Sequence, residues 1–240
     1  MDGWLSRQNM LIGNEATQRL KDARAAIIGL GGVGGASVEA IARCGVGNVF
    51  VMDYDIFEPS NINRQILALS SNVGTAKSDA AKARIGEINP DANITAVNGK
   101  FCLDTSDKLA DFKPDYVIDA IDTVSAKIEL IEFCRDNGVA VISCMGTGNR
   151  IDAHAFAIGD IEETPGCGCP LARVMRRELH KRGISGITVL YSKGLPLEPK
   201  DKGESPASIS FVPPVAGYLM AGHVIREILE LKNDQSISNG

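Results

Sequence analysis

The chain has 240 residues, of which 44% are hydrophobic and 23% charged, and its formal net charge is −5. This composition excludes a disordered chain, and 25 glycines without a three-residue period exclude a collagen. An acidic protein is not a general polyanion binder, so contact with nucleic acid requires a local basic patch. We find neither a secretion signal nor an apolar run long enough for a membrane, and we expect a soluble, cytoplasmic protein.

Short apolar runs alternate with helical periodicity in the first half of the chain, which is typical of βαβ units on a parallel sheet. We predict strands at 24–29, 48–53, 93–97, 115–119 and 140–145, and helices at 36–44, 75–88 and 125–137. After residue 148 we predict strands at 153–158 and 187–191, a basic helix at 170–182, a loop at 194–208, a helix at 214–232 and a tail at 233–240. The fold class is α/β, with a Rossmann-like, doubly wound and mostly parallel sheet.

A glycine-rich turn, Gly29-x-Gly31-x-x-Gly34, lies between the first strand and the first helix. Glycines in this place let phosphates approach the free N–H groups at the start of a helix. Asp53 ends the second strand, 19 residues (53 − 34) after the last glycine, where a carboxylate can bind ribose hydroxyls. By itself the motif favours an NAD enzyme, and a merely tight strand-to-helix turn is the structural alternative.

Charged residues further along the chain favour ATP over NAD. Asn61-Ile62-Asn63-Arg64-Gln65 precedes Lys77 at another helix start, and Asp119-Ala120-Ile121-Asp122 ends a strand. Attack on the α-phosphate of ATP builds negative charge that a fixed arginine and lysine stabilise, whereas hydride transfer needs no such pair. Asp122 offers a carboxylate to Mg²⁺ bound to the phosphates. We interpret 1–240 as one domain, with a nucleotide-binding half at about 1–148 and a substrate-side half at about 149–240.

Together these motifs resemble the ubiquitin-activating-enzyme-like adenylating family, over about residues 6–146. The resemblance implies that Asp53 binds ribose, that Arg64 and Lys77 bind the phosphates, and that Asp122 serves Mg²⁺ and catalysis. It also matches Arg7-Gln8 to a pair whose arginine enters the ATP site of the neighbouring subunit of a homodimer; an exposed terminal charge is the alternative. The nucleotide-binding set it implies is Gly29, Gly31, Gly32, Gly34, Asp53, Asp55, Asn61, Asn63, Arg64, Gln65, Lys77 and Asp122, and the catalytic set is Arg64, Lys77, Asp122 and Arg7.

The cysteines separate two branches of this family. Members that activate ubiquitin-like sulfur carriers usually hold zinc with two Cys-x-x-Cys pairs, but Cys167-Gly168-Cys169 is one residue short and no cysteine follows it. Completion of a zinc site by His154 or His180 is a weaker alternative. For Cys167 and Cys169 themselves a reactive thiol pair is an alternative to simple packing.

A cluster of cations follows this pair. Arg173, Arg176, Arg177, Lys181 and Arg182 are opposed only by Glu178. The cluster suits RNA phosphates, although a solvated helix face explains it equally well.

The sequence at 169–179 and SISFVPPVAG at 208–217 resemble the tRNA threonylcarbamoyladenosine dehydratase branch of the family. The likeness implies tRNA as a partner, with a sulfur-relay protein as a possible further partner. It also implies antiparallel strands that extend the sheet in the C-terminal half.

The activity implied by this likeness is an ATP-dependent dehydration of a tRNA nucleoside. ATP adenylates the threonyl carboxylate of threonylcarbamoyladenosine, and the carbamoyl group of the same nucleoside then expels AMP and closes a ring. The main alternative is an adenylyltransferase for the C-terminus of a ubiquitin-like sulfur carrier. A non-catalytic nucleotide-binding scaffold and an NAD dehydrogenase are further hypotheses.

Overall fold

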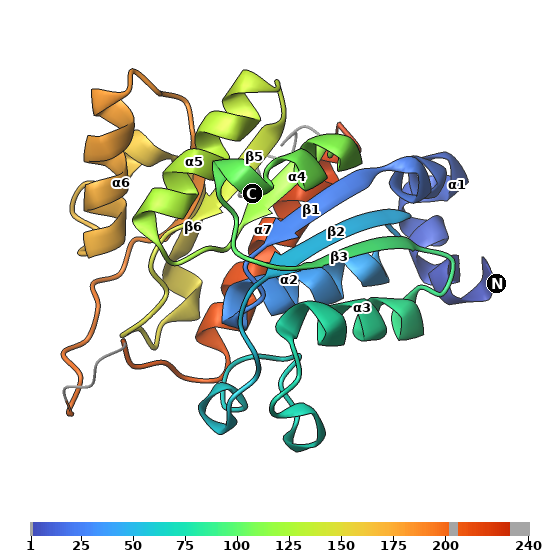
Figure 1. Cartoon of the computed structure of the whole chain (residues 1–240), viewed down its shortest axis with the longest axis horizontal. Helices are drawn as coiled ribbons and strands as arrows, with labels where there is room; N and C mark the ends of the chain where they lie inside the picture. The colour runs from blue at the N-terminus through green and yellow to red at the C-terminus, as the bar shows by residue number, and fades with distance from the viewer. Residues whose placement is uncertain (1, 202–205, 231–240) are drawn as a thin grey trace, which may run out of the picture.

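A single seven-stranded sheet runs through the molecule and is covered by helices on both faces (Figure 1). The computed structural model describes residues 2–201 and 206–230. The strands are β1 (Arg24–Ile28), β2 (Asn48–Asp53), β3 (Asn93–Asn98), β4 (Tyr116–Asp119), β5 (Ala140–Cys144), β6 (Phe156–Asp160) and β7 (Thr188–Ser192). The helices are α1 (Ser6–Asp22), α2 (Gly32–Arg43), α3 (Lys77–Ile88), α4 (Asp107–Phe112), α5 (Val124–Asp136), α6 (Pro170–Lys181) and α7 (Val212–Ile228).

The strand order is β3-β2-β1-β4-β5-β7-β6. Every neighbouring pair is parallel except β6 and β7, which are antiparallel at one edge of the sheet. The predicted fold class, a doubly wound and mostly parallel sheet with an antiparallel extension, is confirmed. The order reverses between β1 and β4, and ligands of such sheets bind outside the carboxyl ends of the strands at this point.

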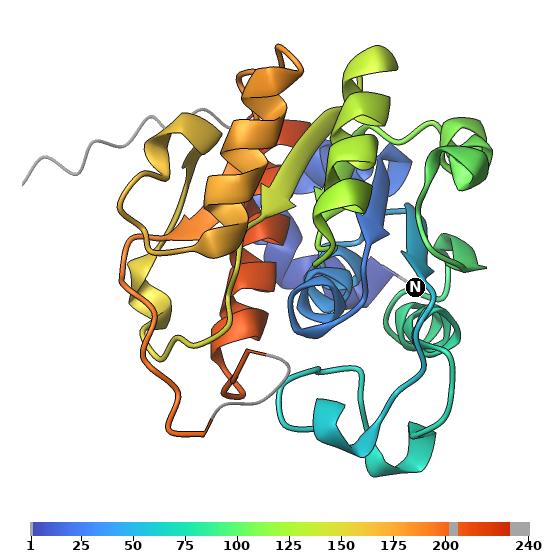
Figure 2. The same ribbon diagram turned by 60° about the vertical axis from the view of Figure 1, so that its left-hand side comes forward.

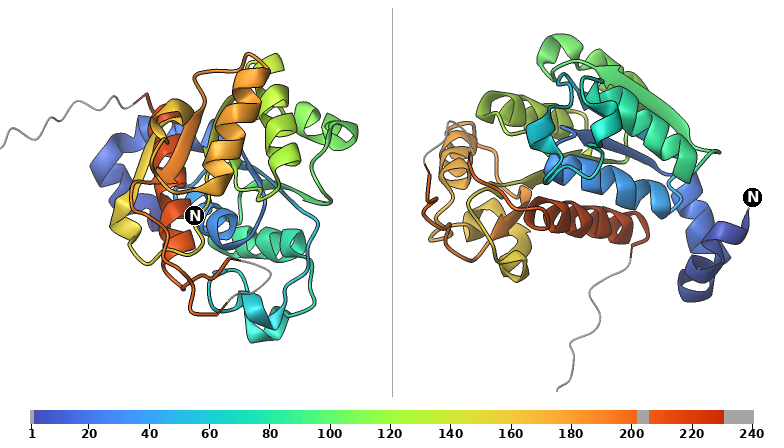
Figure 3. Two further views of the ribbon diagram at one scale, coloured as in Figure 1. Left: turned by 90° about the vertical axis from the view of Figure 1, so that its left-hand side faces the viewer. Right: turned by 90° about the horizontal axis from the view of Figure 1, so that it is seen from below.

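Alternating side chains of the strands pack into three hydrophobic clusters, one on one face of the sheet and two on the other. On β1, Ala25 and Ile27 pack toward α2, α3 and α7, whereas Ala26 and Ile28 pack toward α4 and α5. α6 lies beside α5, as the turned view in Figure 2 shows. Figure 3 shows α2 and α7 side by side on their common face, with α1 beyond one end of the sheet. Both faces are covered, as the apolar strands require.

The helix after the glycine turn begins at Gly32, four residues before the predicted start, so the second part of the glycine run forms its first turn. The reason is close packing. A Cβ on Gly34 would collide with the carbonyl oxygen of Gly29, and a Cβ on Gly217 of α7 would collide with that of Val33. The glycines therefore let α2 start directly against β1 and lie directly against α7.

Other differences are local. The chain forms two helices that we do not predict from sequence, α1 and the short α4. Of the strand predicted at 153–158, Ala153–Ala155 is a 3₁₀ turn and β6 starts at Phe156. The predicted tail at 233–240, the end of the predicted last helix and residues 202–205 of the predicted loop lie outside the described residues. Among the helices that the structure describes, none is long and apolar enough to span a membrane.

Candidate active site

The glycine turn forms a cradle at the carboxyl end of β1. Gly29 has φ +89°, and a Cβ there would lie 2.6 Å from the carbonyl oxygen of Ala120, which follows β4. Gly31 caps α2 without any side-chain hydrogen bond to the first turn. The first N–H groups of α2 therefore remain available, and together with the helix dipole they favour a phosphate.

Asp53 holds the cradle to the end of β2. Its buried carboxylate accepts hydrogen bonds from the backbone N–H of Leu30 at 2.6 Å and from that of Asp55 at 2.8 Å. Each carboxylate oxygen thus already has one backbone donor and keeps a further lone pair. This geometry places Asp53 beside the phosphate cradle, and its role at ribose stays a prediction.

Lys77 and Asp122 lie near the same strand end. The Lys77 ammonium, largely buried at the first residue of α3, donates to the Asp55 carboxylate at 2.9 Å. The nearby Asp55 carboxylate, partial burial, and the charges of Asp122 and Asp53 together raise the pKa of Tyr54. Three carboxylates therefore lie near one exposed tyrosine at the carboxyl edge of the sheet, and Asp122 is exposed.

The segment from Asn61 to Gln65 packs against the start of α2. A Cβ on Gly32 would lie 3.0 Å from the carbonyl oxygen of Arg64. The guanidinium of Arg64 donates to the carbonyl of Ser60 at 2.7 Å and to Oδ1 of Asn63 at 3.0 Å. In the described part of the chain Arg64 makes no ion pair with a carboxylate. Its backbone thus lies against the start of α2, while its guanidinium is held by its own loop and is not neutralised by a carboxylate of the described residues.

A buried ion pair, which the sequence does not reveal, supports the loop that carries Asp122. Lys127 of α5 donates to Asp119 at 2.9 Å, and both side chains are 0% exposed. The ammonium also donates to the carbonyl of Ile121 at 3.0 Å, and Ser143 donates to Asp119 at 2.7 Å. Lys127 therefore fixes the turn between β4 and Asp122.

Of the buried polar atoms that the structure describes, three without a partner lie at this edge, and a fourth lies in α1. Among the described residues, four buried side-chain atoms lack a hydrogen-bond partner: those of Asn9, Gln65, Ser78 and Ser208. Gln65 lies beside Gly31, Ser78 follows Lys77, and the carbonyl of Ser208 accepts from Asn63. Because buried polar groups normally find partners, this arrangement fits a polar ligand such as a nucleotide.

The site offers few protein ligands for a bound metal ion. The described residues contain no group of three metal-ligating side chains. They offer Mg²⁺ the accessible carboxylate of Asp122, which suits an ion that takes its other ligands from phosphates and water.

Arg7 lies far from this cradle within its own chain. It is exposed near the start of α1, and its neighbour Gln8 donates to the carbonyl of Cys44 at 3.0 Å. Cys44 ends α2, whereas the cradle lies at the other end of that helix. Met10 and Leu11, in the next turn of α1, are 87% and 85% exposed.

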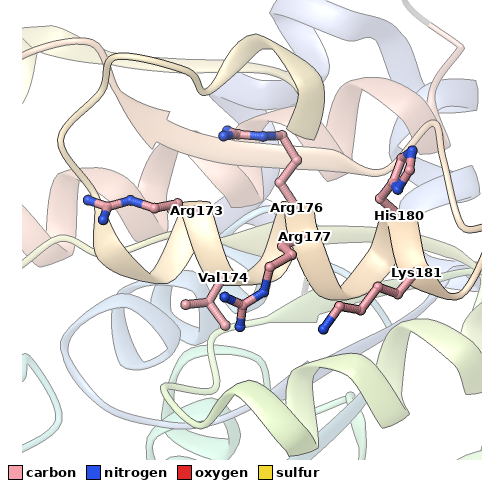
Figure 4. Close-up of a pocket in the computed structure, with 6 residues that line it drawn as sticks. All are labelled: Arg173, Val174, Arg176, Arg177, His180 and Lys181. Carbon is pink, nitrogen blue, oxygen red and sulfur yellow. The ribbon is translucent and has the colours of Figure 1, made fainter.

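The predicted basic helix is α6, which carries a shallow depression of about 380 Å³. Figure 4 shows Arg173, Arg176 and His180 on one side of the helix, and Arg177 and Lys181 on the other. Glu178 accepts from Lys181 at 3.0 Å, Arg177 at 3.1 Å and Arg182 at 2.9 Å, and these bonds lower its pKa to about 2. One carboxylate thus partly neutralises three of the cations, whereas the Arg173 side chain has no partner among the residues that the structure describes.

None of the six cysteines is in a disulfide. Burial raises the pKa of the Cys144 thiol to about 12, which keeps it protonated and favours packing over catalysis. Cys167 and Cys169 are buried beneath α6, and Sγ of Cys169 accepts from the backbone N–H groups of Gly146 at 3.3 Å and Ala172 at 3.4 Å. Cys169 thereby caps α6 and ties it to the end of β5.

Comparison with known proteins extends over nearly the whole chain. The model of the ThiF family matches residues 5–239. The tRNA threonylcarbamoyladenosine dehydratase of Bacillus subtilis is 39% identical, over 94% of each chain. The structure of the Escherichia coli tRNA N6-threonylcarbamoyladenosine dehydratase, TcdA, in complex with ATP is similar with a TM-score of 0.88 and 30% identity, over 95% of each chain. A molybdopterin-synthase adenylyltransferase of Haemophilus influenzae is 36% identical over 63% of this chain and 61% of its own.

Proposed function

This chain belongs to the ThiF family, and from that membership we propose that it is an ATP-dependent dehydratase of threonylcarbamoyladenosine in tRNA, acting in the cytoplasm. The observation that carries the proposal is the likeness to a dehydratase of this nucleoside over 94% of the chain, substrate-side half included. The match to an adenylyltransferase of the other branch covers only 63%. The second cysteine pair that a Cys₄ zinc site needs is also missing from the sequence.

The proposed reaction removes one water in two steps. The threonyl carboxylate attacks the α-phosphate of ATP, which forms an acyl-adenylate and releases pyrophosphate. The carbamoyl group of the same nucleoside then attacks the acyl carbon, the bond to AMP breaks, and the carbamoyl N–H loses its proton as the ring closes. Both reacting groups belong to one nucleoside, so their effective molarity is high and no nucleophile of the enzyme is needed. No sulfur is transferred in these two steps, and a sulfur-relay partner stays a prediction.

We assign Arg64 and Lys77 to the phosphates, where a guanidinium fork and an ammonium stabilise the charge that grows on the α-phosphate and the leaving pyrophosphate. Lys77 must share its ammonium between Asp55 and the phosphates, because it already donates to that carboxylate. Asp122 would hold Mg²⁺ that arrives with ATP. When bound, the ion would neutralise part of the charge on the leaving group.

Purified protein, ATP and tRNA that carries the modification test the function directly. We expect AMP, pyrophosphate and a nucleoside lighter by one water, measured by mass spectrometry of the digested tRNA. Transfer RNA without the modification is the matched control and should release no AMP. ATP consumption without a change in nucleoside mass would refute the proposal.

The cations of α6 (Arg173, Arg176, Arg177, Lys181 and Arg182) are proposed to contact tRNA phosphates. Two observations support this proposal: the depression is basic although the protein is acidic, and the Arg173 side chain has no partner among the described residues. Arg173→Gln should therefore weaken tRNA binding and reduce the slope of log K against log salt concentration by about 0.7–1. Glu178→Gln should strengthen binding, because it frees Arg177 and Lys181 and leaves Arg182 paired with Glu132 alone.

Titration of labelled tRNA at several salt concentrations measures both effects. Lys108→Gln removes one exposed cation from α4 and serves as the control for charge alone. If Arg173→Gln and Lys108→Gln gave equal slopes of log K against log salt concentration, α6 would not belong to the RNA-binding surface.

We further propose a homodimer in which Arg7 of one subunit completes the ATP site of the other. The exposed side chains of Met10 and Leu11 beside Arg7 support an interface there. Arg7→Ala and Arg64→Ala should each inactivate the enzyme. Because one site of a mixed dimer then has both arginines, co-expression of the two variants should restore about a quarter of the wild-type activity. No restoration in mixed dimers, verified by native mass measurement, would mean that Arg7 does not act in the neighbouring site.

A further inference from the structure

Asn149 and Arg150, two residues outside every motif discussed above, join the loops on the substrate side of the active site. Arg150 is 6% exposed, and its guanidinium donates to three backbone carbonyls: Gly146 at 3.3 Å, Cys167 at 3.1 Å, and Gly194. In the described part of the chain it has no carboxylate partner. Gly146 follows β5, Gly194 follows β7, and Cys167 precedes α6, so one side chain connects three loops.

Asn149 connects one more segment, at Ala207, to the same point and adds a second contact to the segment after β7. Its φ is +57°, a left-handed conformation that asparagine tolerates better than most residues. Its Oδ1 accepts from the N–H of Ala207 at 2.7 Å, and its own N–H donates to the carbonyl of Ala207 at 2.7 Å. Its carbonyl accepts from the N–H of Leu197 at 2.7 Å. We call Asn149 and Arg150 the substrate-side brace.

The brace is continuous with the catalytic segment. Ser208, the residue after Ala207, accepts from Nδ2 of Asn63 at 3.3 Å, and Asn63 directly precedes Arg64. At its other end the brace reaches Gly146, whose N–H is held by Cys169, the cap of the basic helix α6. A path of direct contacts therefore runs from the arginine at the phosphates to the helix assigned to RNA.

The chemistry of Arg150 favours a positioning role over simple stability. Burying a cation without a carboxylate is unfavourable, and a neutral side chain would avoid that cost. A guanidinium is nevertheless the side chain whose fixed donors can hold three carbonyls at once. Its partners belong to loops at the carboxyl edge of the sheet rather than to the interior of strands or helices. By holding these three loops together, Arg150 sets the shape of the site that they surround.

We propose that Asn149 and Arg150 are positioning residues for the modified nucleoside. They hold in place the loops described above, which form the wall of the site on the side where the nucleoside meets ATP. They do not take part in binding ATP itself. This inference rests on the proposed function, because it assumes a tRNA substrate on this side of the cradle.

The test separates the KM for tRNA from the Kd for ATP in four variants of the full chain. Asn149→Ala and Arg150→Met should raise the KM for modified tRNA about tenfold or more. Arg150→Met removes the three buried or part-buried bonds to the loops, and Asn149→Ala removes the bond from Ala207 and leaves alanine in a left-handed conformation. Arg150→Lys should behave like Arg150→Met, because an ammonium cannot replace the fork. Asn149→Asp keeps the acceptor oxygen and should retain wild-type kinetics. The Kd for ATP should stay within about twofold in all four.

An unchanged KM for tRNA in folded Asn149→Ala and Arg150→Met would overturn the inference. So would a loss of ATP affinity equal to the rise in KM, or unfolding of both variants, because the brace would then serve the fold. A wild-type protein that releases no AMP with modified tRNA would instead refute the proposed function, so the two failures are distinguishable.

Discussion

Replacing Arg64 with alanine is expected to lower AMP formation at saturating ATP and tRNA by about 10²–10³-fold, the usual effect of removing one group that stabilises transition-state charge. The guanidinium is half-exposed and binds only its own loop, at Ser60 and Asn63, so its loss should leave the melting temperature almost unchanged. The effect should therefore appear in kcat rather than in folding. Single-turnover release of AMP measures it directly.

Arg64→Lys tests the nature of the contribution. A lysine keeps the charge but lacks the planar fork, so we expect only partial recovery. Arg135→Ala, an exposed arginine of α5 that pairs with Asp136, is the matched control and should keep full activity. Undiminished AMP formation by Arg64→Ala would show that the site does not work as proposed.

Replacing Lys127 with methionine is expected to lower the free energy of unfolding by about 3–5 kcal/mol, because it leaves the carboxylate of Asp119 buried without its partner. For a chain of this size the melting temperature should fall by about 10 °C. The loop that carries Asp122 also loses the hydrogen bond to Ile121, so the activity of the folded fraction should fall too. Denaturant titration together with AMP release separates the two effects.

A second substitution tests the cause of that loss. Adding Asp119→Asn to Lys127→Met removes the unpaired charge, and much of the lost stability should return. Breaking the exposed pair Arg135–Asp136 instead should change the stability by no more than about 0.5 kcal/mol. If Lys127→Met costs no more than that surface pair, the buried ion pair does not hold the loop.

The regular part of the fold could be predicted because its signals are local. Strands β1, β2, β4 and β5 follow apolar runs that differ from the predicted ranges by one residue at most. By contrast α1 buries only Thr17 and Leu20 and contains Gly13 with φ +83°, so it lacks the wide apolar stripe by which a core-facing helix is recognised. Helix α2 begins inside the glycine run because of contacts to β1 and α7 that no local pattern contains.

The sequence proposes site residues where a motif marks them, and their roles stay predictions; it gives no signal where burial alone gives a residue its place. Arg64, Lys77 and Asp122 stand in recognisable segments. Lys127 and Arg150 look like surface charges in the sequence, and only the folded chain shows that both are buried. Similarly, five cations counted along the sequence of α6 suggest an undivided basic surface, whereas Glu178 binds three of them.

The contact between α2 and α7 also bears on modularity. Ser37, in the helix that follows the phosphate cradle, donates to the carbonyl of Gly217 at 3.0 Å, and Pro213 lies against Gly32. The last described helix thus forms the floor under the first nucleotide-binding helix. A fragment that stops near residue 148 would keep every motif for ATP yet expose the underside of its own cradle. We therefore expect that residues 1–148 would not fold stably without α7.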